Sequence, residues 1–366
     1  MSEQTMRLGV IGFAHMHVNA LIDDFDKLEN VEWVACADTP AKTPSTSRAF
    51  GTRHANVQRS MEHTGIAQYY QDYREMLEKE SFDLIIVCSE NAQHAAVVEA
   101  VADKGIHIVV EKPMATTLAD ALRMVKAAER NHVKLIVNWP STWMPGIRKA
   151  HELVTAGEVG QVLRFKYRNG ASLGPMAYGQ EITDVEKGQE WWHQAATGGG
   201  AYMDYCCYGA NLSRWFLGEA AVAAYGLQAN LNSHYGDADD NGVVVARYPK
   251  AVAILEGSWT MVHSGVSNGP IIYGTDGTMV VDGAKVLVYK ERRNPEPTQV
   301  YDDNTLPVGR ESLAREVQHH LTTGEPLHPT LDLPVNIDAM ALLDAGLRSA
   351  ASGELELVND IRWTIG

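Results

Sequence analysis

Lys112 is the residue whose type and setting most clearly predict chemistry in this chain. It lies in VVEKPMATT (109–117), where Glu111, Lys112 and Pro113 follow a short apolar run. Because a proline restricts the residue before it to extended backbone, the lysine is expected to remain at a strand end. A lysine at the carboxyl end of a parallel strand can donate to a substrate hydroxyl and stabilise a developing alkoxide. An ordinary surface lysine is the alternative, which the buried acid–Lys–Pro run disfavours.

A carboxylate and a phenol follow in the stretch TGGGAYMDYCCYGANLSRWFLG (197–218), where three glycines precede a predicted amphipathic helix. Asp204 and Tyr208 are four residues apart, so they are expected on one helix face. Both could point into a cleft and contact a substrate. Alternatively, Asp204 caps the helix and Tyr208 belongs to the core. The spacing alone favours neither interpretation.

The third candidate is LGVIGFAHMHVNAL (8–21), which has the pattern of a dinucleotide-binding turn with most of its glycines replaced. In G-x-G-x-x-G, the glycines allow a tight turn, close approach of the pyrophosphate and helix packing. Gly12, Ala14 and His17 occupy these positions. Asp38, at the end of the next predicted strand, could accept hydrogen bonds from ribose hydroxyls and repel a 2′-phosphate. It therefore favours NAD over NADP, unless it is only a turn or cap residue.

The same turn contains His15 and His17 on either side of Met16, which raises the question of a metal. Structural zinc usually needs four ligands, and no second ligand pair is spaced nearby. No metal is therefore predicted. We expect the large His17 side chain to displace the first helix slightly, with His15 or His17 turned toward the cofactor or the cleft.

The elements that must position these residues begin with a doubly wound parallel sheet. Short apolar runs alternate with helical patterns, which is typical of strands covered on both faces. Strands are predicted over 7–12, 31–37, 82–88, 106–111 and 133–138, and helices over 16–28, 92–104 and 117–131. Positions 51–70 fit less well and are expected to form an extra loop and a short helix. Residues 1–140 are thus predicted to form a Rossmann-like domain.

The pattern changes after residue 140, where an α+β domain over 141–366 is predicted. A helix over 145–156 is followed by turn-separated strand candidates, which indicate a large, mostly antiparallel open sheet. These candidates are 161–169, 241–248, 251–260, 270–274, 278–282 and 284–289. Helices over 310–323 and 334–351 close the chain and are expected to pack back on the first domain.

Composition narrows the partners of this 366-residue chain. The formal net charge of -15 disfavours binding to nucleic acid, and no apolar run approaches the length of a membrane helix. No secretion signal is evident, and four cysteines make no disulfide framework in a chain of this length. We therefore expect a cytoplasmic protein whose partner is a small, neutral or weakly charged molecule.

Taken together, these motifs resemble those of the Gfo/Idh/MocA family, named for glucose–fructose oxidoreductase and inositol dehydrogenase. The matching parts are the turn at Gly12, CSENAQH (88–94), EKP (111–113), GGGAYMDYCCY (198–208) and GRESLAREVQHHLTTGEPLHP (309–329). The resemblance spans nearly the whole chain. It implies a Rossmann domain, an open-sheet substrate domain, a carbohydrate or polyol substrate, and assembly as a homodimer or homotetramer.

The resemblance also implies roles for individual residues. Lys112, Asp204 and Tyr208 are the expected catalytic residues, with Tyr208 standing where many members have a histidine. The expected cofactor-binding residues are Gly12, Phe13, Ala14, His15, Met16, Asp38, Ser89, Asn91, His94, Glu111 and Lys112. The expected substrate-binding residues are Lys112, Trp143, Trp192, His193, Asp204 and Tyr208.

The sequence therefore predicts an NAD-dependent oxidoreductase that transfers hydride between a sugar, polyol or glycoside hydroxyl and nicotinamide. A neighbouring ammonium and the nicotinamide charge are expected to lower the pKa of Tyr208, and burial to lower that of Lys112. One alternative is an NAD-dependent glycosidase or lyase that oxidises the sugar transiently and retains its cofactor, with His193, Asp184 and Glu181 as candidate acids or bases. A second alternative is a non-catalytic NAD-sensing protein.

Overall fold

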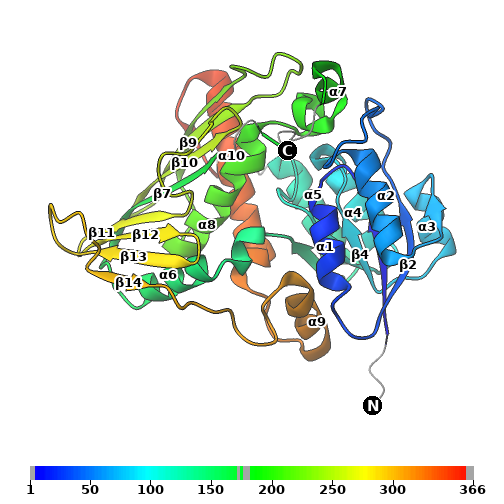
Figure 1. Ribbon diagram of the computed structural model, residues 1–366, viewed down its shortest axis with the longest axis horizontal. Coiled ribbons are helices and arrows are strands. Elements are labelled where there is room, and N and C mark those ends of the chain that lie inside the picture. The colour runs from blue at the N-terminus through cyan, green and yellow to red at the C-terminus, as the bar shows by residue number, and fades with distance from the viewer. Residues whose placement is uncertain (1–4, 171–173, 176–181, 360–366) are drawn as a thin grey trace.

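The computed structural model describes residues 5–170, 174–175 and 182–359. Two β-sheets face each other with helices between them (Figure 1). The first sheet has six parallel strands in the order β3-β2-β1-β4-β5-β6. Its strands are β1 (Met6–Ile11), β2 (Val31–Ala37), β3 (Tyr69–Tyr70), β4 (Leu84–Val87), β5 (His107–Val110) and β6 (Leu135–Val137). The predicted doubly wound parallel sheet is confirmed.

Helices cover this sheet because its strands are apolar on both faces; every residue of β4 is fully buried. The helices are α1 (His17–Phe25), α2 (Arg53–Thr64), α3 (Tyr73–Lys79), α4 (His94–Ala102) and α5 (Leu118–Arg130). The expectation for positions 51–70 missed strand β3, which pairs with Cys36 and Ala37 of β2. Two residues are too few to show a strand pattern in the sequence.

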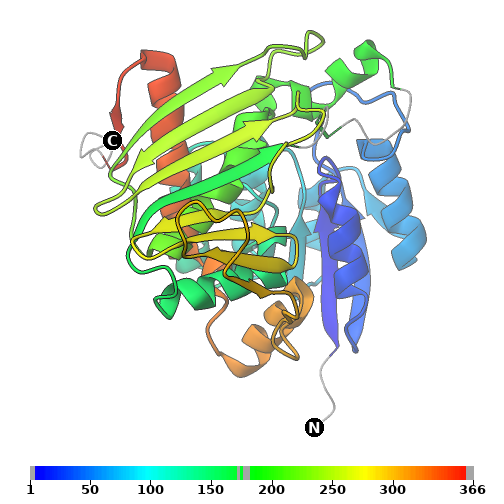
Figure 2. The same cartoon turned by 60° about the vertical axis from the view of Figure 1, so that its left-hand side comes forward.

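The second sheet has nine strands in the order β14-β13-β12-β11-β7-β10-β9-β8-β15 (Figure 2). All neighbouring strands are antiparallel except the β7–β10 pair, so the predicted mostly antiparallel sheet is confirmed. The strands are β7 (Val162–Gly170), β8 (Ala223–Ala229), β9 (Asn241–Arg247), β10 (Val252–Ser258), β11 (Ile271–Gly274), β12 (Thr278–Asp282), β13 (Lys285–Tyr289), β14 (Gln299–Tyr301) and β15 (Glu356–Leu357).

Strands β8, β14 and β15 were not predicted, and β8 shows why. Its sequence AAYGLQA is rich in small residues because helix α10 packs closely against it. A Cβ atom at Gly226 would lie 2.1 Å from the carbonyl oxygen of Gly346 in that helix. The small residues reflect this packing and carry little strand propensity of their own.

The remaining helices connect the two sheets. They are α6 (Pro145–Thr155), α7 (Asp184–Gln189), α8 (Cys207–Leu217), α9 (Leu313–Thr323) and α10 (Leu333–Ser352). Helices α8 and α10 lie between the sheets, while α9 packs against α1 (Figure 1). Helix α10 also contacts α5, and the Ala314 amide donates to Asp24 Oδ2 at 2.9 Å. The closing helices therefore pack on the six-stranded region, while a domain boundary at residue 140 stays a proposal.

Two further features concern membranes and thiols. Within the described part of the chain, no helix combines the length and apolarity needed to cross a membrane. All four cysteines are buried and carry no disulfide bond.

Candidate active and cofactor site

Lys112 lies two residues beyond the end of β5 (His107–Val110) and is almost completely buried, at 1% exposure. Its Nζ atom lies 2.5 Å from Asp204 Oδ1 and 3.1 Å from the Asp204 carbonyl oxygen. The same atom lies over the Tyr208 ring, 4.8 Å from the ring centre. The structure thus brings together the three residues predicted to be catalytic, and their roles stay predictions.

The Asp204 carboxylate is placed by a π-helical turn, η5 (Tyr202–Cys206), that leads into α8. Such turns are rare and occur frequently at functional sites. The glycines before it allow close approach to the first sheet: a Cβ atom at Gly198 would lie 2.3 Å from Thr116 Cγ2. The Asn91 side chain donates to the Gly198 carbonyl at 2.8 Å. The glycine run therefore holds the Asp204 turn against the Lys112 strand end.

Aromatic side chains surround this charged pair. Trp259 Nε1 donates to Asp204 Oδ2 at 3.3 Å. Trp139 meets the Tyr208 ring edge-on with centroids 5.5 Å apart, and Tyr167 stacks with it at 6.4 Å. The sequence did not single out Trp259 or Tyr167, because each lies in a strand segment without a recognisable motif.

The pKa shifts at this centre are opposite to those expected. Burial raises the pKa of Tyr208 well above its ordinary value, and the nearby Lys112 charge offsets only part of this. For Lys112, burial alone would lower the pKa, but the Asp204 carboxylate raises it well above the usual value. Both expected reductions were therefore wrong, and the centre holds a protonated lysine and a neutral phenol at neutral pH.

Glu111, the residue before Lys112, is completely buried and contacts other side chains. His17 Nδ1 lies 2.8 Å from Glu111 Oε1, and Asn138 donates to Oε2 at 2.7 Å. Burial alone would raise the pKa of Glu111, but His17 and the nearby Lys112 bring it below the ordinary value. His17 thus reaches from the start of α1 to the end of β5, which answers where its large side chain goes.

His15 is buried beside Trp192, with ring centroids 4.5 Å apart. Its Nδ1 atom accepts from the His17 backbone amide at 3.1 Å, so the neutral ring carries its proton on Nε2. The pKa of His15 lies well below the ordinary value. Burial is the largest cause, and the neighbouring His17 and Lys112 add to it. Ligand atoms of His15, His17 and Glu111 lie within 4.8 Å of one another, but a protonated Nε2 cannot coordinate a metal. The geometry favours hydrogen bonding here, and the absence of a metal stays a prediction.

The turn after β1 keeps the glycine that matters most for its shape. Gly12 has a φ of 90°, and a Cβ atom there would lie 2.4 Å from the Ser89 amide nitrogen. Asp38 Oδ1 accepts from the amides of Phe13 at 3.1 Å and Thr39 at 2.8 Å. Asp38 therefore stabilises the turn, which was the alternative role considered from the sequence. Asp38 also forms part of a cavity wall.

This cavity of about 380 Å³ lies beside Asp38 at the ends of β2 and β3 and is also lined by Thr39, Arg53 and Tyr69. The Arg53 guanidinium forms ion pairs with both Asp38 and Glu90. Parallel sheets bind nucleotides at this edge, and a carboxylate at this place suits ribose hydroxyls. The residues present therefore fit the adenosine end of a dinucleotide. Arg53 was missed because it begins a helix far from any motif.

The neighbouring turn, in contrast, is covered by residues of the second region. Trp191 Nε1 donates to the Ala14 carbonyl at 2.8 Å, and its ring lies 4.0 Å from that of Trp192. Between Trp191 and the Arg53–Glu90 pair, a void of only about 10 Å³ remains. A pyrophosphate binds at the start of the first helix in such folds, and the Trp191 side chain lies beside this turn. Met16 is partly buried against the same tryptophans.

Two other predicted cofactor contacts have structural partners. The His94 ring nitrogens lie 3.2 Å from the carbonyl oxygens of Pro113 and Ser89, so this buried ring ties the end of β4 to that of β5. Asn91 is held by its bond to the glycine run, although its Oδ1 atom has no partner among the described residues.

Of the other predicted substrate residues, His193 lies near the Asp204 carboxylate, whereas Trp192 and Trp143 pack elsewhere. His193 is buried edge-on to Tyr235 and Trp259, its ring nitrogens have no described partner, and burial lowers its pKa to about 4. Through Trp259 it adjoins the Asp204 carboxylate. Trp192 is buried against His15, and Trp143, in the 3-10 turn after β6, packs against the main core.

The acids considered for a lyase do not assemble in the described structure. Asp184 is exposed at the start of α7, where its Oδ2 atom pairs with His234 Nε2 at 2.9 Å. Glu181 lies outside the described residues.

A parallel six-stranded sheet, a Gly12 turn and a nucleotide-sized cavity beside Asp38 define a dinucleotide-binding fold of the oxidoreductase type. Residues 6–139 match the oxidoreductase family with an NAD-binding Rossmann fold, and residues 147–280 match the GFO/IDH/MocA C-terminal domain. The chain belongs to the GFO/IDH/MocA family, which confirms the resemblance seen in the sequence.

Curated relatives match over part of their length. D-xylose 1-dehydrogenase [NADP(+)] of Haloarcula marismortui is 25% identical over 218 residues, which cover 59% of this chain and 58% of that enzyme. Myo-inositol 2-dehydrogenase of Thermotoga maritima is 25% identical over 239 residues, which cover 64% and 66% of the two chains. The match thus spans about three fifths of these relatives.

Solved structures match over nearly the whole fold. Aldose-aldose oxidoreductase from Caulobacter crescentus, complexed with glycerol, has a TM-score of 0.75 at 20% identity, covering 97% of this chain and 100% of that one. The WlbA dehydrogenase from Bordetella pertussis, in complex with NADH and UDP-GlcNAcA, has a TM-score of 0.73 at 19% identity, covering 98% and 100%. At these identities the likeness concerns the fold.

Proposed function

We propose that this protein is an NAD-dependent dehydrogenase acting on a hydroxyl group of a sugar or polyol. The observation that carries the proposal is the buried Lys112 ammonium, held by Asp204 over the Tyr208 ring at the carboxyl edge of the parallel sheet. The names of the relatives, a xylose dehydrogenase and an inositol dehydrogenase, support a substrate of this class.

The protonation states support a role for the chain's own residues in the chemistry. Bound NAD would supply the hydride acceptor or donor. Lys112 and Tyr208 keep their protons at neutral pH, so they form a hydrogen-bonding pair for the substrate oxygen and supply its proton when a carbonyl is reduced. In the oxidative direction the same pair must first lose a proton. Trp259 and Trp139 contact the centre, and its burial strengthens these charge interactions.

Charge around Arg53 supports NAD rather than NADP. Asp38 and Glu90 are two carboxylates that share this one guanidinium. The Arg53 guanidinium is therefore already paired with two carboxylates, and the three groups together carry a net negative charge beside the cavity. Asp38 Oδ1 is engaged by backbone amides, and its second oxygen would accept from the ribose.

The experiment that tests the function is a screen for NAD reduction over pentoses, hexoses, inositols and glycosides, followed at 340 nm, with the product position found by NMR. We expect reduction of NAD by at least one free sugar or inositol, and a loss of that activity in Lys112→Ala and Tyr208→Phe. Full turnover of glycosides without net reduction would contradict the proposal and indicate the lyase chemistry. NAD binding with no turnover over the whole panel would indicate a sensing protein.

We also propose a homodimer or homotetramer in the cytoplasm. The outer face of the nine-stranded sheet exposes Tyr225, Leu227, Val245 and Val252 on neighbouring strands. A row of exposed apolar side chains on a soluble protein marks a contact surface. Light scattering after gel filtration is expected to give a multiple of the 40.2 kDa chain mass. A monomer at micromolar concentration would contradict this assembly.

A further inference from the structure

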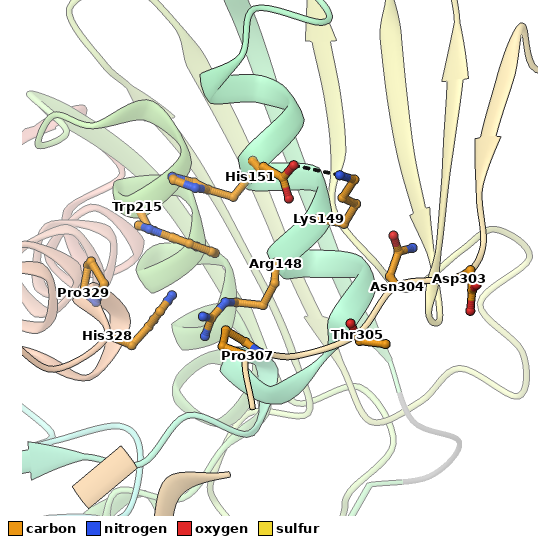
Figure 3. Close-up of a pocket in the computed structure, with 11 residues that line it drawn as sticks. Arg148, Lys149, His151, Trp215, Asp303, Asn304, Thr305, Pro307, His328 and Pro329 are labelled. Carbon is orange, nitrogen blue, oxygen red and sulfur yellow. Dashed lines mark hydrogen bonds and ion pairs between the residues drawn. The ribbon is translucent and has the colours of Figure 1, made fainter. Parts of the chain in front are cut away.

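A second cavity, of about 530 Å³, lies apart from both sites described above (Figure 3). It is bounded by the first turns of α6, the end of α8, the segment 303–307 and the turn at His328 and Pro329. None of its lining residues belongs to the Lys112 centre or to the Asp38 cavity. The volume falls within the range of about 300–1,000 Å³ that is usual for small-molecule sites.

Arg148 places a guanidinium group at this cavity. Its side chain reaches from α6 toward His328 and Pro307 (Figure 3). In the part of the chain that the structure describes, the Arg148 guanidinium has neither a hydrogen bond nor an ion pair. The nearby Glu316 carboxylate is taken by Arg310, whose Nε atom donates to it at 2.6 Å, and by the His328 amide at 2.6 Å. Arg310 also lies 3.9 Å from Glu325 Oε2, so the Glu316 carboxylate is engaged by Arg310 and is not paired with Arg148.

His328 adds a directed donor beside this charge. Its Nδ1 atom accepts from the Thr330 amide at 3.4 Å, so the neutral ring carries its proton on Nε2. Burial lowers the pKa of His328 to about 3, so the ring is neutral under ordinary conditions. No described residue accepts a hydrogen bond from Nε2. An anion in the cavity can thus receive hydrogen bonds from a guanidinium and an imidazole.

The opposite wall offers groups for hydroxyls. The Asn304 amide nitrogen donates to the carbonyl oxygens of Ala284 and Tyr301, which leaves its Oδ1 atom as an acceptor. The Thr305 hydroxyl lies next to it on the wall. A neighbouring acceptor and hydroxyl suit a polyol, whose hydroxyls both donate and accept.

Other charged and aromatic groups also line the cavity. Lys149 is paired with Glu152 at 2.7 Å, so these two cancel, and Asp303 is exposed at the rim. The Trp215 ring stacks on His151 with centroids 3.8 Å apart and forms a flat apolar wall. Such a wall suits the apolar face of a sugar-like body.

The frame of the cavity is fixed by buried hydrogen bonds. Thr330 Oγ1 lies 2.8 Å from His328 Nδ1 and 2.5 Å from Thr142 Oγ1. Asn336 donates to the Thr330 carbonyl at 3.0 Å and accepts from Trp139 Nε1 at 2.7 Å. A site held in place before binding loses less conformational entropy when its ligand arrives.

We propose that this cavity binds a small hydroxylated monocarboxylate of the sugar-acid class, with its carboxylate against Arg148 and the His328 Nε2–H group. A bidentate guanidinium–carboxylate contact is among the strongest hydrogen-bonded pairs in proteins. The single Arg148 guanidinium matches one carboxylate, whereas a phosphate ester brings nearly two negative charges near pH 7.

The test is calorimetric titration of the full chain with D-gluconate, D-glucose and glucose 6-phosphate in low-salt buffer. We expect gluconate to bind the wild type and to bind Arg148→Ala at least about tenfold more weakly, a loss of about 1.4 kcal/mol. The control Arg130→Ala removes an exposed arginine paired with Asp103 and should leave the affinity unchanged. Binding should persist in Lys112→Ala, and an excess of D-glucose should not displace gluconate.

Several results would overturn the assignment. These are the absence of gluconate binding at millimolar concentrations, equal affinity in Arg148→Ala, or loss of binding only in Lys112→Ala, which would place the ligand in the other cleft. Tighter binding of glucose 6-phosphate at Arg148 would overturn the carboxylate class. If Arg148→Ala does not fold, Arg148→Gln gives the same comparison, and unchanged affinity in that variant contradicts the proposal.

Discussion

Two charged clusters lie at the carboxyl edge of the same parallel sheet, and they are assembled differently. The Lys112–Asp204 pair joins residues 92 positions apart in the chain and is buried between the two sheets. The cluster of Asp38, Arg53 and Glu90 comes entirely from the first region and borders an open cavity. The nucleotide end can thus form within the first region, whereas the reacting centre exists only when both regions are folded together.

The sharpest test of this comparison is Lys112→Ala. We expect kcat to fall by about 10³-fold, because a positioned donor to the developing oxyanion is lost. The affinity for NAD should change by no more than a few fold, since the Asp38 cavity is untouched. Steady-state kinetics and calorimetric titration with NAD measure the two effects.

The control for that variant is Lys104→Ala, which removes an exposed lysine paired with Glu78. It should leave both quantities unchanged. Turnover of Lys112→Ala within a few fold of the wild type would contradict the role given to the buried lysine.

The second test concerns Arg53→Ala, which leaves two carboxylates without their shared cation. Glu90 is 1% exposed, so we expect the free energy of unfolding to fall by about 3 kcal/mol. Urea denaturation measures this loss. Arg59→Ala removes a more exposed ion pair with Asp23 and should cost less than about 1 kcal/mol. If both variants lost the same free energy of unfolding, the Arg53 ion pairs would contribute no more to stability than an exposed ion pair does.

The third test is Asp38→Asn, which keeps the side-chain shape and removes the charge. We expect the KM for NAD to rise about tenfold, because hydrogen bonds to a charged acceptor are lost, while kcat stays within about twofold. The KM for NADP should fall in the same variant. If kcat fell as strongly as in Lys112→Ala, the division between a binding cluster and a reacting cluster would be wrong.

The smallest expected effect is that of pH on carbonyl reduction. Because the pKa values of Lys112 and Tyr208 are both raised, each keeps its proton, and kcat/KM for reduction should change little between about pH 6 and about pH 9. Oxidation needs the deprotonated form, so its kcat/KM should rise by about tenfold per pH unit below the raised pKa. Initial rates in both directions give the profiles. A fall in reduction near neutral pH would contradict the assigned protonation states.

The sequence predicted the parts of the fold that carry their own pattern. Apolar runs such as Val31–Ala37 and Thr278–Asp282 became strands with the expected bounds. Strands β3 and β15 have two residues each, and β8 is adapted to a helix that lies more than a hundred residues away. These elements depend on their partners, so local sequence could not reveal them.

The site was predictable to the extent that it lies in motifs. Lys112, Asp204 and Tyr208 were found because a strand end and a glycine run mark them. Arg53 was not found, since it acts through ion pairs with Asp38 and Glu90 that no local pattern marks. The pKa directions were wrong because the expectation neither measured how deeply Tyr208 is buried nor placed Asp204 against Lys112.

The position of the closing helices has a consequence for synthesis of the protein. Helix α10 packs on α5 and β6, and α9 packs on α1, although both helices are translated after all fifteen β-strands but one. Domains generally fold as they leave the ribosome, from the N-terminus onward. The last strand of the first sheet ends at Val137. The surfaces of α1 and α5 that contact α9 and α10 therefore stay exposed until these last helices have been synthesised. The nascent chain therefore has an interval in which a chaperone can recognise it and a premature stop would leave it unfinished.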